Sequence, residues 1–279
     1  MRLRWGEVNK MDKQRTTSCI TAERIKQYLA EGKRFDDRKL DQFRNLIIEK
    51  NVSNKAEGSV RVRLGKTEVL VGVKMATSEP YADSPTKGNL MVTAELLPLS
   101  AARFESGPPK FEAIELGRVT DRGLRESGFI DFDKLCIEPG KKVWTVFVDV
   151  YSINDDGNMM DAATIGAIAA LKIAKIPKYD AENDKVLFDE LTDVSLPLTD
   201  IVPVAVSVHK IGNSLIVDPT REEEDISESR ITIGSSKGMI SSLQKSNSTA
   251  LEMDEMKKVF EIAAKVSEDV LDSIEKALK

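Results

Sequence analysis

The sequence predicts an α/β fold made of two similar βα halves, with mixed sheets and with helices packed between them. Three observations lead to this prediction. Apolar residues alternate along two expected hairpins, 59–75 and 203–218. A strand with a glycine-containing turn runs into an apolar helix over 148–176. The last helix carries a long apolar stripe, which requires a surface to pack against.

Residues 148–176 are the expected centre of the fold. After the turn, small residues form one slim helix face, made of Ala162, Ala163, Gly166, Ala167, Ala170 and Ala174. A helix that begins directly after a turn offers unpaired N–H groups and a positive dipole end, which together suit an anion. The first residues of this helix are Met159, Met160 and Asp161. Thioethers cannot donate to a phosphate and a carboxylate repels one, so the place suits an anion but its residues do not.

The remaining elements follow from local patterns. In chain order we expect a helix over 21–32, a strand over 89–97, a loop over 100–109, a helix over 111–127, a strand over 143–153, short strands near 230–233 and 239–243, and a final helix. Thr249 and Glu252 form an expected capping box for the final helix, whose predicted buried stripe begins at Met253. Residues 178–200 are expected to be a linker. The predicted organisation is an extension over 1–19 and two halves over 20–190 and 191–279.

Composition narrows the possible functions. The 279 residues are 41% hydrophobic, enough for one large core or two smaller ones, and no apolar run is long enough to cross a bilayer. Two distant cysteines, Cys19 and Cys136, favour a reduced, cytoplasmic chain. The single histidine, His209, excludes multi-histidine metal sites, and we expect it at a strand edge without a chemical role. The net charge of −5 means that nucleic-acid binding would need a local basic patch.

The helix over 111–127 is the best candidate for such a patch. Arg118, Arg122 and Arg125 recur on one face. One interpretation is a solvated face with local ion pairs, namely Glu115 with Arg118, Glu126 with Arg122, and Asp121 with Arg125. The other is contact with phosphates, for which the planar guanidinium is well suited.

Three segments occur together in a family-specific order. They are AELLPLSAARFESGPPKFEAIELGRVTDRGLRES (94–127), VDVYSINDDGNMMDAATIGA (148–167) and VAVSVHKIGNSLIVDPTREEE (204–224). Together they resemble the RNase PH superfamily of phosphate-dependent 3′→5′ exoribonucleases. More narrowly, they resemble the non-catalytic ring subunit of the archaeal exosome.

The resemblance implies that the catalytic site has degenerated in this chain. Active members bind phosphate at the turn before the central helix, where this chain has Met159 and Met160, followed by Asp161. Active members also carry two aspartates after the second hairpin, and alignment at Asp218 places them at or beside Glu224 and Arg230. Phosphorolysis requires a held phosphate and an acid. The resemblance therefore implies no catalytic residues, no metal and no cofactor in this chain.

The resemblance also implies partners. It implies a hexameric ring of three heterodimers with a catalytic RNase PH-like subunit, RNA-binding cap proteins and single-stranded RNA, without a membrane. Arg118 and Arg122 match arginines that hold RNA phosphates, and Arg103 lies in a loop that contacts RNA in active relatives. The hairpin arginines Arg61 and Arg63 either line the RNA channel or are ordinary exposed strand residues.

Some alternatives remain at this point. The chain could be a self-sufficient, metal-dependent ribonuclease that uses the acidic run Glu222–Asp225, although a solvated acidic turn is the simpler interpretation of that run. It could also be a scaffold without RNA contact. Met159 and Met160 could form a soft partner surface or fill core space.

Overall fold

The computed structural model describes residues 17–279, and residues 1–16 of the expected N-terminal extension lie outside this range. Its elements are, in order, α1 (Cys19–Ala30), β1 (Leu46–Lys50), β2 (Gly58–Leu64), β3 (Thr67–Ser78), β4 (Asn89–Glu95), α2 (Phe111–Glu126), the short 3₁₀ helix η1 (Phe132–Leu135), β5 (Cys136–Glu138), β6 (Lys142–Asn154), α3 (Met159–Ile173), β7 (Lys175–Asp180), β8 (Lys185–Ser195), β9 (Val204–Ile211), β10 (Ser214–Val217), α4 (Arg221–Asp225), β11 (Ser229–Ser236), β12 (Met239–Ser246) and α5 (Met253–Leu278). The predicted α/β class is confirmed.

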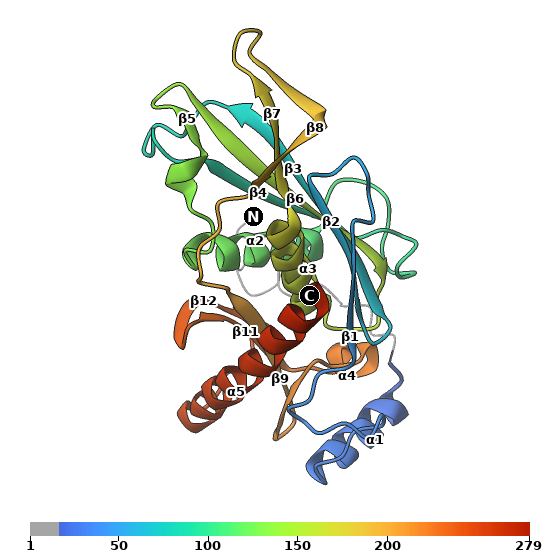
Figure 1. The fold of residues 1–279 in the computed structure, drawn as a ribbon. Coiled ribbons are helices and arrows are strands. Elements are labelled where there is room, and N and C mark those ends of the chain that lie inside the picture. The colour runs from blue at the N-terminus through green and yellow to red at the C-terminus, as the bar shows by residue number, and fades with distance from the viewer. Residues whose placement is uncertain (1–16) are drawn as a thin grey trace, which may run out of the picture.

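Two sheets lie on opposite sides of α3 (Figure 1). The first has the order β1–β2–β3–β6–β4, with β5 also paired to β6. It is mixed, because β4 runs parallel to β6 while the other pairs are antiparallel. The second has the order β10–β9–β11–β12 and is antiparallel throughout. The two hairpins predicted from alternation are β2–β3 and β9–β10, with the first turn at Gly65 in the left-handed region (φ +60°).

Helix α3 is the centre of the core, and it packs against β2 and β3 on one side and β9 on the other. Its residues from Met159 to Leu171 are all buried. The slim face lets the first sheet approach closely, since a Cβ added at Gly166 would lie 2.6 Å from Cγ2 of Val71. A helix that is buried all round carries no outward polar face. Any chemistry involving α3 must therefore use its ends.

Helices α2 and α5 flank this centre (Figure 1). Helix α2 packs on β4, α3 and β12, and α5 packs on β9, β11 and β1. The buried stripe of α5 is Val259, Ala263, Val266, Val270 and Ile274. The prediction for its start was wrong, because Glu252 and Glu255 form the capping box and Met253 is 74% exposed. The usual box has Ser or Thr as its first residue, so the sequence pattern favoured Thr249 over the Glu252 that the structure uses.

The expected linker over 178–200 was wrong in part. Residues 175–195 form the β7–β8 hairpin, which projects from the first sheet (Figure 1). A two-stranded ribbon without a fully buried face needs no apolar alternation, so charged residues hid it in the sequence. The expected boundary after residue 190 falls within β8. His209 was also misplaced, because it is buried in β9 between β10 and β11.

Among the helices of residues 17–279, none combines the length and apolarity needed to cross a membrane.

Candidate functional site

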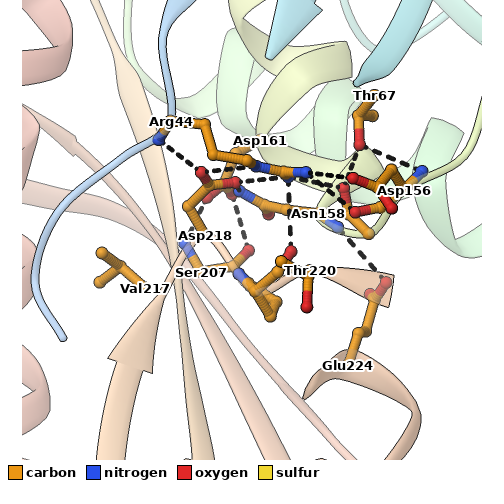
Figure 2. Close-up of polar contacts among 12 residues, drawn as sticks. Arg44, Thr67, Asp156, Asn158, Asp161, Ser207, Val217, Asp218, Thr220 and Glu224 are labelled. Atoms are coloured by element: carbon orange, nitrogen blue, oxygen red, sulfur yellow. Dashed lines mark hydrogen bonds and ion pairs between the residues drawn. The ribbon is translucent and has the colours of Figure 1, made fainter. Parts of the chain in front are cut away.

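The α3 turn, which we define as residues 155–158, joins β6 to α3 and is held by Arg44 (Figure 2). Nη1 of Arg44 donates to the carbonyl of Asp156 at 2.9 Å, and Nη2 donates to the carbonyl of Gly157 at 3.0 Å. Thr67 of β3 also donates from its hydroxyl to the Gly157 carbonyl, at 2.6 Å. The turn is therefore fixed through its own backbone oxygens, by Arg44 in the segment before β1 and by Thr67 of β3.

The carboxylate of Asp218, at the end of β10, organises these contacts. Its oxygens accept from Arg44 at 2.7 and 2.9 Å, from Arg38 at 2.9 Å, and from the side-chain amide of Asn158 at 2.8 Å. The side chain of Asp218 is fully buried. Burial lowers the pKa of the Arg44 guanidinium, but the bonds and charge of Asp218 outweigh this and hold that pKa above its ordinary value. Asp218 thus ties the second half of the chain to the α3 turn.

Asp161 lies in the first turn of α3 and is also fully buried. Its two carboxylate oxygens accept from the backbone N–H of Ser207 at 3.0 Å and from the Ser207 hydroxyl at 2.7 Å. Burial raises the pKa of Asp161 to about 7, with a smaller upward contribution from the charge of Asp218, against the lowering effect of the Ser207 donors. This carboxyl group therefore changes its protonation near neutral pH.

A third carboxylate reaches the start of α3. Oε2 of Glu224, on α4, accepts from the backbone N–H of Asn158 at 3.3 Å (Figure 2). Asn158 is the residue before the helix, in the left-handed region (φ 55°). The N–H groups at a helix start attract anions. In this chain the N–H of Asn158 already donates to the carboxylate of Glu224, and Asp161 and Asp218 lie close by.

Helix α4 differs from the expected solvated acidic turn. Glu223 and Asp225 are buried, at 4% and 6% exposure. Glu223 pairs with Arg34, and Arg221 pairs with both Glu224 (3.2 Å) and Asp225. Burial lowers the pKa of Arg221, and the charges of Glu224, Asp225 and Asp155 overcome this effect and raise it. Three of the four acidic residues of the run, Glu223, Glu224 and Asp225, are therefore held in ion pairs with arginines, while Glu222 is exposed.

Met159 and Met160, two residues of the predicted degenerate phosphate site, begin α3 and are 8% and 5% exposed. Both belong to the main hydrophobic core, which agrees with the interpretation that they fill core space. They are brought together with Asp161, but only the carboxylate makes polar contacts across the two halves. The start of α3 therefore offers no cationic side chain of its own to an incoming phosphate.

The predicted RNA-binding arginines have different surroundings. Arg118 and Arg122 are exposed on α2, and within the described part of the chain neither has an ion pair. Glu115 does not pair with Arg118, because it binds Arg230 of β11 at 2.7 Å. Arg125 does pair with Asp121 as predicted, at 2.6 Å.

Arg103 is only 17% exposed and is paired with Asp155, with Glu112 at 3.7 Å. Its guanidinium also lies over the ring of Phe104, 4.2 Å from the centroid. The hairpin arginines Arg61 and Arg63 both pair with glutamates of β1 and β3. To contact RNA, the Arg103 guanidinium would have to leave Asp155 and bind a phosphate instead. Arg103 is therefore the weakest candidate of the three arginines predicted to contact RNA.

Sequence reasoning missed Arg44 and the role of Asp218. The two residues are 174 positions apart, and no local pattern connects them. In the sequence, Asp218 served only as an alignment point. The polar run at 34–38 was a visible signal, because Arg34 is buried at 2% exposure and binds the carbonyls of Val217 and Asp218. This charged run lies within the first predicted half, and through Arg34 it binds the second half.

Comparison with known proteins agrees with this architecture. Residues 42–177 match the model of the 3′ exoribonuclease family, domain 1, and residues 202–266 match domain 2 of the same family. The exosome complex component Rrp42 of Methanocella arvoryzae is 48% identical over 84% of this chain and 87% of its own length. That of Thermococcus onnurineus is 44% identical over 95% and 99%.

Solved structures give the same answer. A chain of the Archaeoglobus fulgidus exosome with RNA bound to the active site superposes with a TM-score of 0.84 at 41% identity, covering 91% of this chain and 97% of that chain. A chain of an archaeal exosome core has a TM-score of 0.80 at 38% identity, with 92% and 96% covered. The matched domains, the relatives and the two-sheet fold around α3 lead to one conclusion: the chain belongs to the RNase PH family of 3′ exoribonucleases, alongside the archaeal Rrp42 proteins.

Proposed function

We propose that this chain is a non-catalytic, RNA-binding subunit of an archaeal exosome ring, and that it supports phosphate-dependent 3′→5′ RNA degradation by a catalytic partner subunit. The relatives named as Rrp42 exosome components support the ring role. The observation that supports a lack of catalysis is the set of acidic residues around the α3 turn. There, Glu224 occupies an N–H at the helix start, and Asp161 and Asp218 lie buried beside it.

The physical reason is electrostatic. Phosphorolysis needs inorganic phosphate positioned against the scissile bond, so the site must attract an anion before it can react. The carboxylates of Glu224 and Asp218 accept from the backbone N–H and the side-chain amide of Asn158, and Arg44, which binds the turn, is already paired with Asp218. Like charges at close range in a buried site disfavour a further anion. Arg118 and Arg122, by contrast, have charge available for phosphate.

The partners follow from the same proposal. The chain alternates with a catalytic RNase PH-like subunit in a hexameric ring of three heterodimers, with RNA-binding cap proteins on the ring and single-stranded RNA as the ligand. Its location is then cytoplasmic. The two halves of the chain are residues 20–190 and 191–279, and residues 1–19 are an N-terminal extension.

Reconstitution tests the catalytic part of the proposal. The purified chain with labelled single-stranded RNA and inorganic phosphate should release no nucleoside diphosphate, whereas addition of the catalytic partner should give phosphate-dependent shortening. Native mass spectrometry of the mixture should show equal numbers of the two subunits. Robust phosphorolysis by the isolated chain would contradict the proposal, and chelator-sensitive, phosphate-independent cleavage would favour the metal-dependent alternative.

Charge reversal tests the RNA contact. In the assembled complex, Arg118→Glu with Arg122→Glu should weaken RNA binding and reduce the slope of log K against log salt, by about 0.7 for each phosphate that is no longer neutralised. The matched control is Lys134→Glu with Lys257→Glu, which changes the net charge equally at exposed lysines that form local ion pairs. Equal affinity of both double variants would leave the chain as a scaffold without RNA contact.

A further inference from the structure

Helix α2 presents a continuous exposed row that includes two apolar side chains. Phe111 is 64% exposed and Ile114 is 51% exposed, and Arg118 and Arg122 are exposed on the same helix. At about 100° per residue these four positions fall within roughly 80° of one another around the helix axis. We call Phe111, Ile114, Arg118 and Arg122 the α2 stripe.

The opposite face of α2 shows that the stripe points away from the core. Ala113, Leu116, Gly117, Thr120 and Leu124 are buried. A Cβ added at Gly117 would lie 3.2 Å from the carbonyl oxygen of Val92 in β4, so that face is pressed against the first sheet. Phe111 and Ile114 therefore have no role in packing the core. Phe111 and Ile114, three residues apart, instead form a small exposed apolar surface beside the two arginines.

The chain itself keeps the positive charge of the stripe uncompensated. Glu115 is the acidic residue best placed to neutralise Arg118, and it is drawn to Arg230 at 2.7 Å and to the hydroxyl of Ser246. Lys110, next to the stripe, binds Glu105. The guanidinium groups of Arg118 and Arg122 thus have no ion pair within residues 17–279, and they can bind the phosphate oxygens of a polyanion.

The order of side chains along α2 fits a single strand of nucleic acid. Arg118 and Arg122 are about 6 Å apart along the axis, and Phe111 lies about 10 Å beyond Arg118. Side chains on a helix lean toward its N-terminus, so Arg118 covers the turn between itself and Phe111. Proteins that bind single strands combine a cationic track for the backbone with aromatic rings on which bases stack.

We propose that Phe111 is a base-stacking residue for single-stranded RNA, with Ile114 extending its apolar surface, on the strand whose phosphates Arg118 and Arg122 hold. This inference rests on the proposed RNA contact and adds a ligand requirement to it. The ligand must carry unpaired bases, because bases within a duplex are already stacked and present no free face.

The test compares Phe111→Ala with Phe188→Ala in the full chain assembled with its catalytic partner. Phe188 is a matched control, since it is 49% exposed and lies on the β7–β8 hairpin. The probes are fluorescent oligoadenylate and a ribose-phosphate strand of equal length without bases. Phe111→Ala should weaken oligoadenylate binding about fivefold to a hundredfold, leave the abasic strand unaffected and leave the salt slope unchanged. Phe111→Tyr should restore binding.

The outcomes separate the two proposals. If Arg118→Gln with Arg122→Gln weakens both probes while Phe111→Ala weakens neither, the stacking role is wrong and the proposed function stands. If none of these variants affects either probe, both fail. If Phe111→Ala instead reduces the subunit stoichiometry seen by native mass spectrometry and leaves RNA affinity intact in the assembled fraction, Phe111 serves protein contact, and the inference is overturned.

Discussion

Charged side chains gather at both the α3 turn and the α2 stripe, but they are buried and paired at the turn, whereas on the stripe they are exposed and, in the described part of the chain, unpaired. At the turn, Asp218 has partners in Arg38, Arg44 and Asn158, and all of its side chain is buried. On the stripe, Arg118 and Arg122 are exposed and have no ion pair within residues 17–279.

Burial explains the difference. A buried charge is costly unless it is paired, so the chain must supply every partner at the turn. An exposed arginine can remain solvated, and its charge is available to a ligand that arrives later. The α3 turn is thus held by a buried cluster of ion pairs that joins the two halves, whereas the α2 stripe is exposed to solvent. Substitutions that change one region and leave the other intact test this difference.

The largest expected effect comes from Asp218→Ala. It leaves Arg44 and Arg38 buried without their shared carboxylate, and loss of one partner of a buried ion pair costs about 3–5 kcal/mol. Denaturant unfolding of the isolated chain measures this change. Asp41→Ala is the control, because its pair with Lys265 is largely exposed and should contribute at most about 1 kcal/mol. An equal loss of unfolding free energy in the two variants would show that the Asp218 ion pairs stabilise the chain no more than a surface pair does.

Asp161→Asn should change the pH dependence of stability. The folded-state pKa of Asp161 is raised from 3.8 to about 7, so between these values the folded chain holds a proton that the unfolded chain has lost. This contribution makes the free energy of unfolding fall as pH rises through that window, and it is constant above it. The total is on the order of 4 kcal/mol.

The measurement is the difference in unfolding free energy between wild type and Asp161→Asn at several pH values. The difference should move in favour of the variant as pH rises from 4 to 7 and then level off. Subtraction removes the opposing effect of the other carboxylates, which are common to both proteins. A difference that does not change with pH would mean that Asp161 keeps an ordinary pKa.

Gly157→Ala tests how tightly the α3 turn is closed against α4. Gly157 has φ +86°, and an added Cβ would lie 2.5 Å from the carbonyl carbon of Thr220 and 2.6 Å from the carbonyl oxygen of Pro219. Backbone strain and overpacking together should cost about 2–4 kcal/mol. Gly140→Ala has a similar φ of +74° with nothing within 4 Å, so it carries the strain alone. Thermal unfolding of the pair isolates the clash, and equal shifts would mean that the turn can relax.

Local periodicity made much of this fold predictable. The small residues of α3 predicted a close approach, and Gly166 against Val71 confirms it. Alternation located β2, β3, β9 and β10 because each presents a face to the core. The β7–β8 hairpin lacked this signal, since charged residues cover it.

The polar part of the site was harder to predict because it depends on pairs distant in sequence. Met159 and Met160 could be identified as unsuited to phosphate from their chemistry alone. The reason why the turn stays closed could not, since Glu224 lies 66 positions from Asn158 and Asp218 lies 174 positions from Arg44. Likewise, spacing along α2 left a pair between Glu115 and Arg118 as one of two interpretations. The partner of Glu115 in the structure is Arg230, which lies on β11 of the second sheet.

The smallest expected effect, and the sharpest test of the open surface, comes from Arg230→Leu. Arg230 acts on the stripe through Glu115: it holds that carboxylate at 2.7 Å and so keeps it from Arg118, three residues further along the helix. Without Arg230, Glu115 is free to pair with Arg118, and such a pair is worth about 0.2–0.5 kcal/mol on a helix. RNA affinity of the assembled complex should fall about twofold, with a shallower salt slope. Glu115→Gln in the same background should restore both, because the amide cannot neutralise Arg118. A loss of affinity that Glu115→Gln fails to rescue would mean that Arg230 acts by some route other than Glu115.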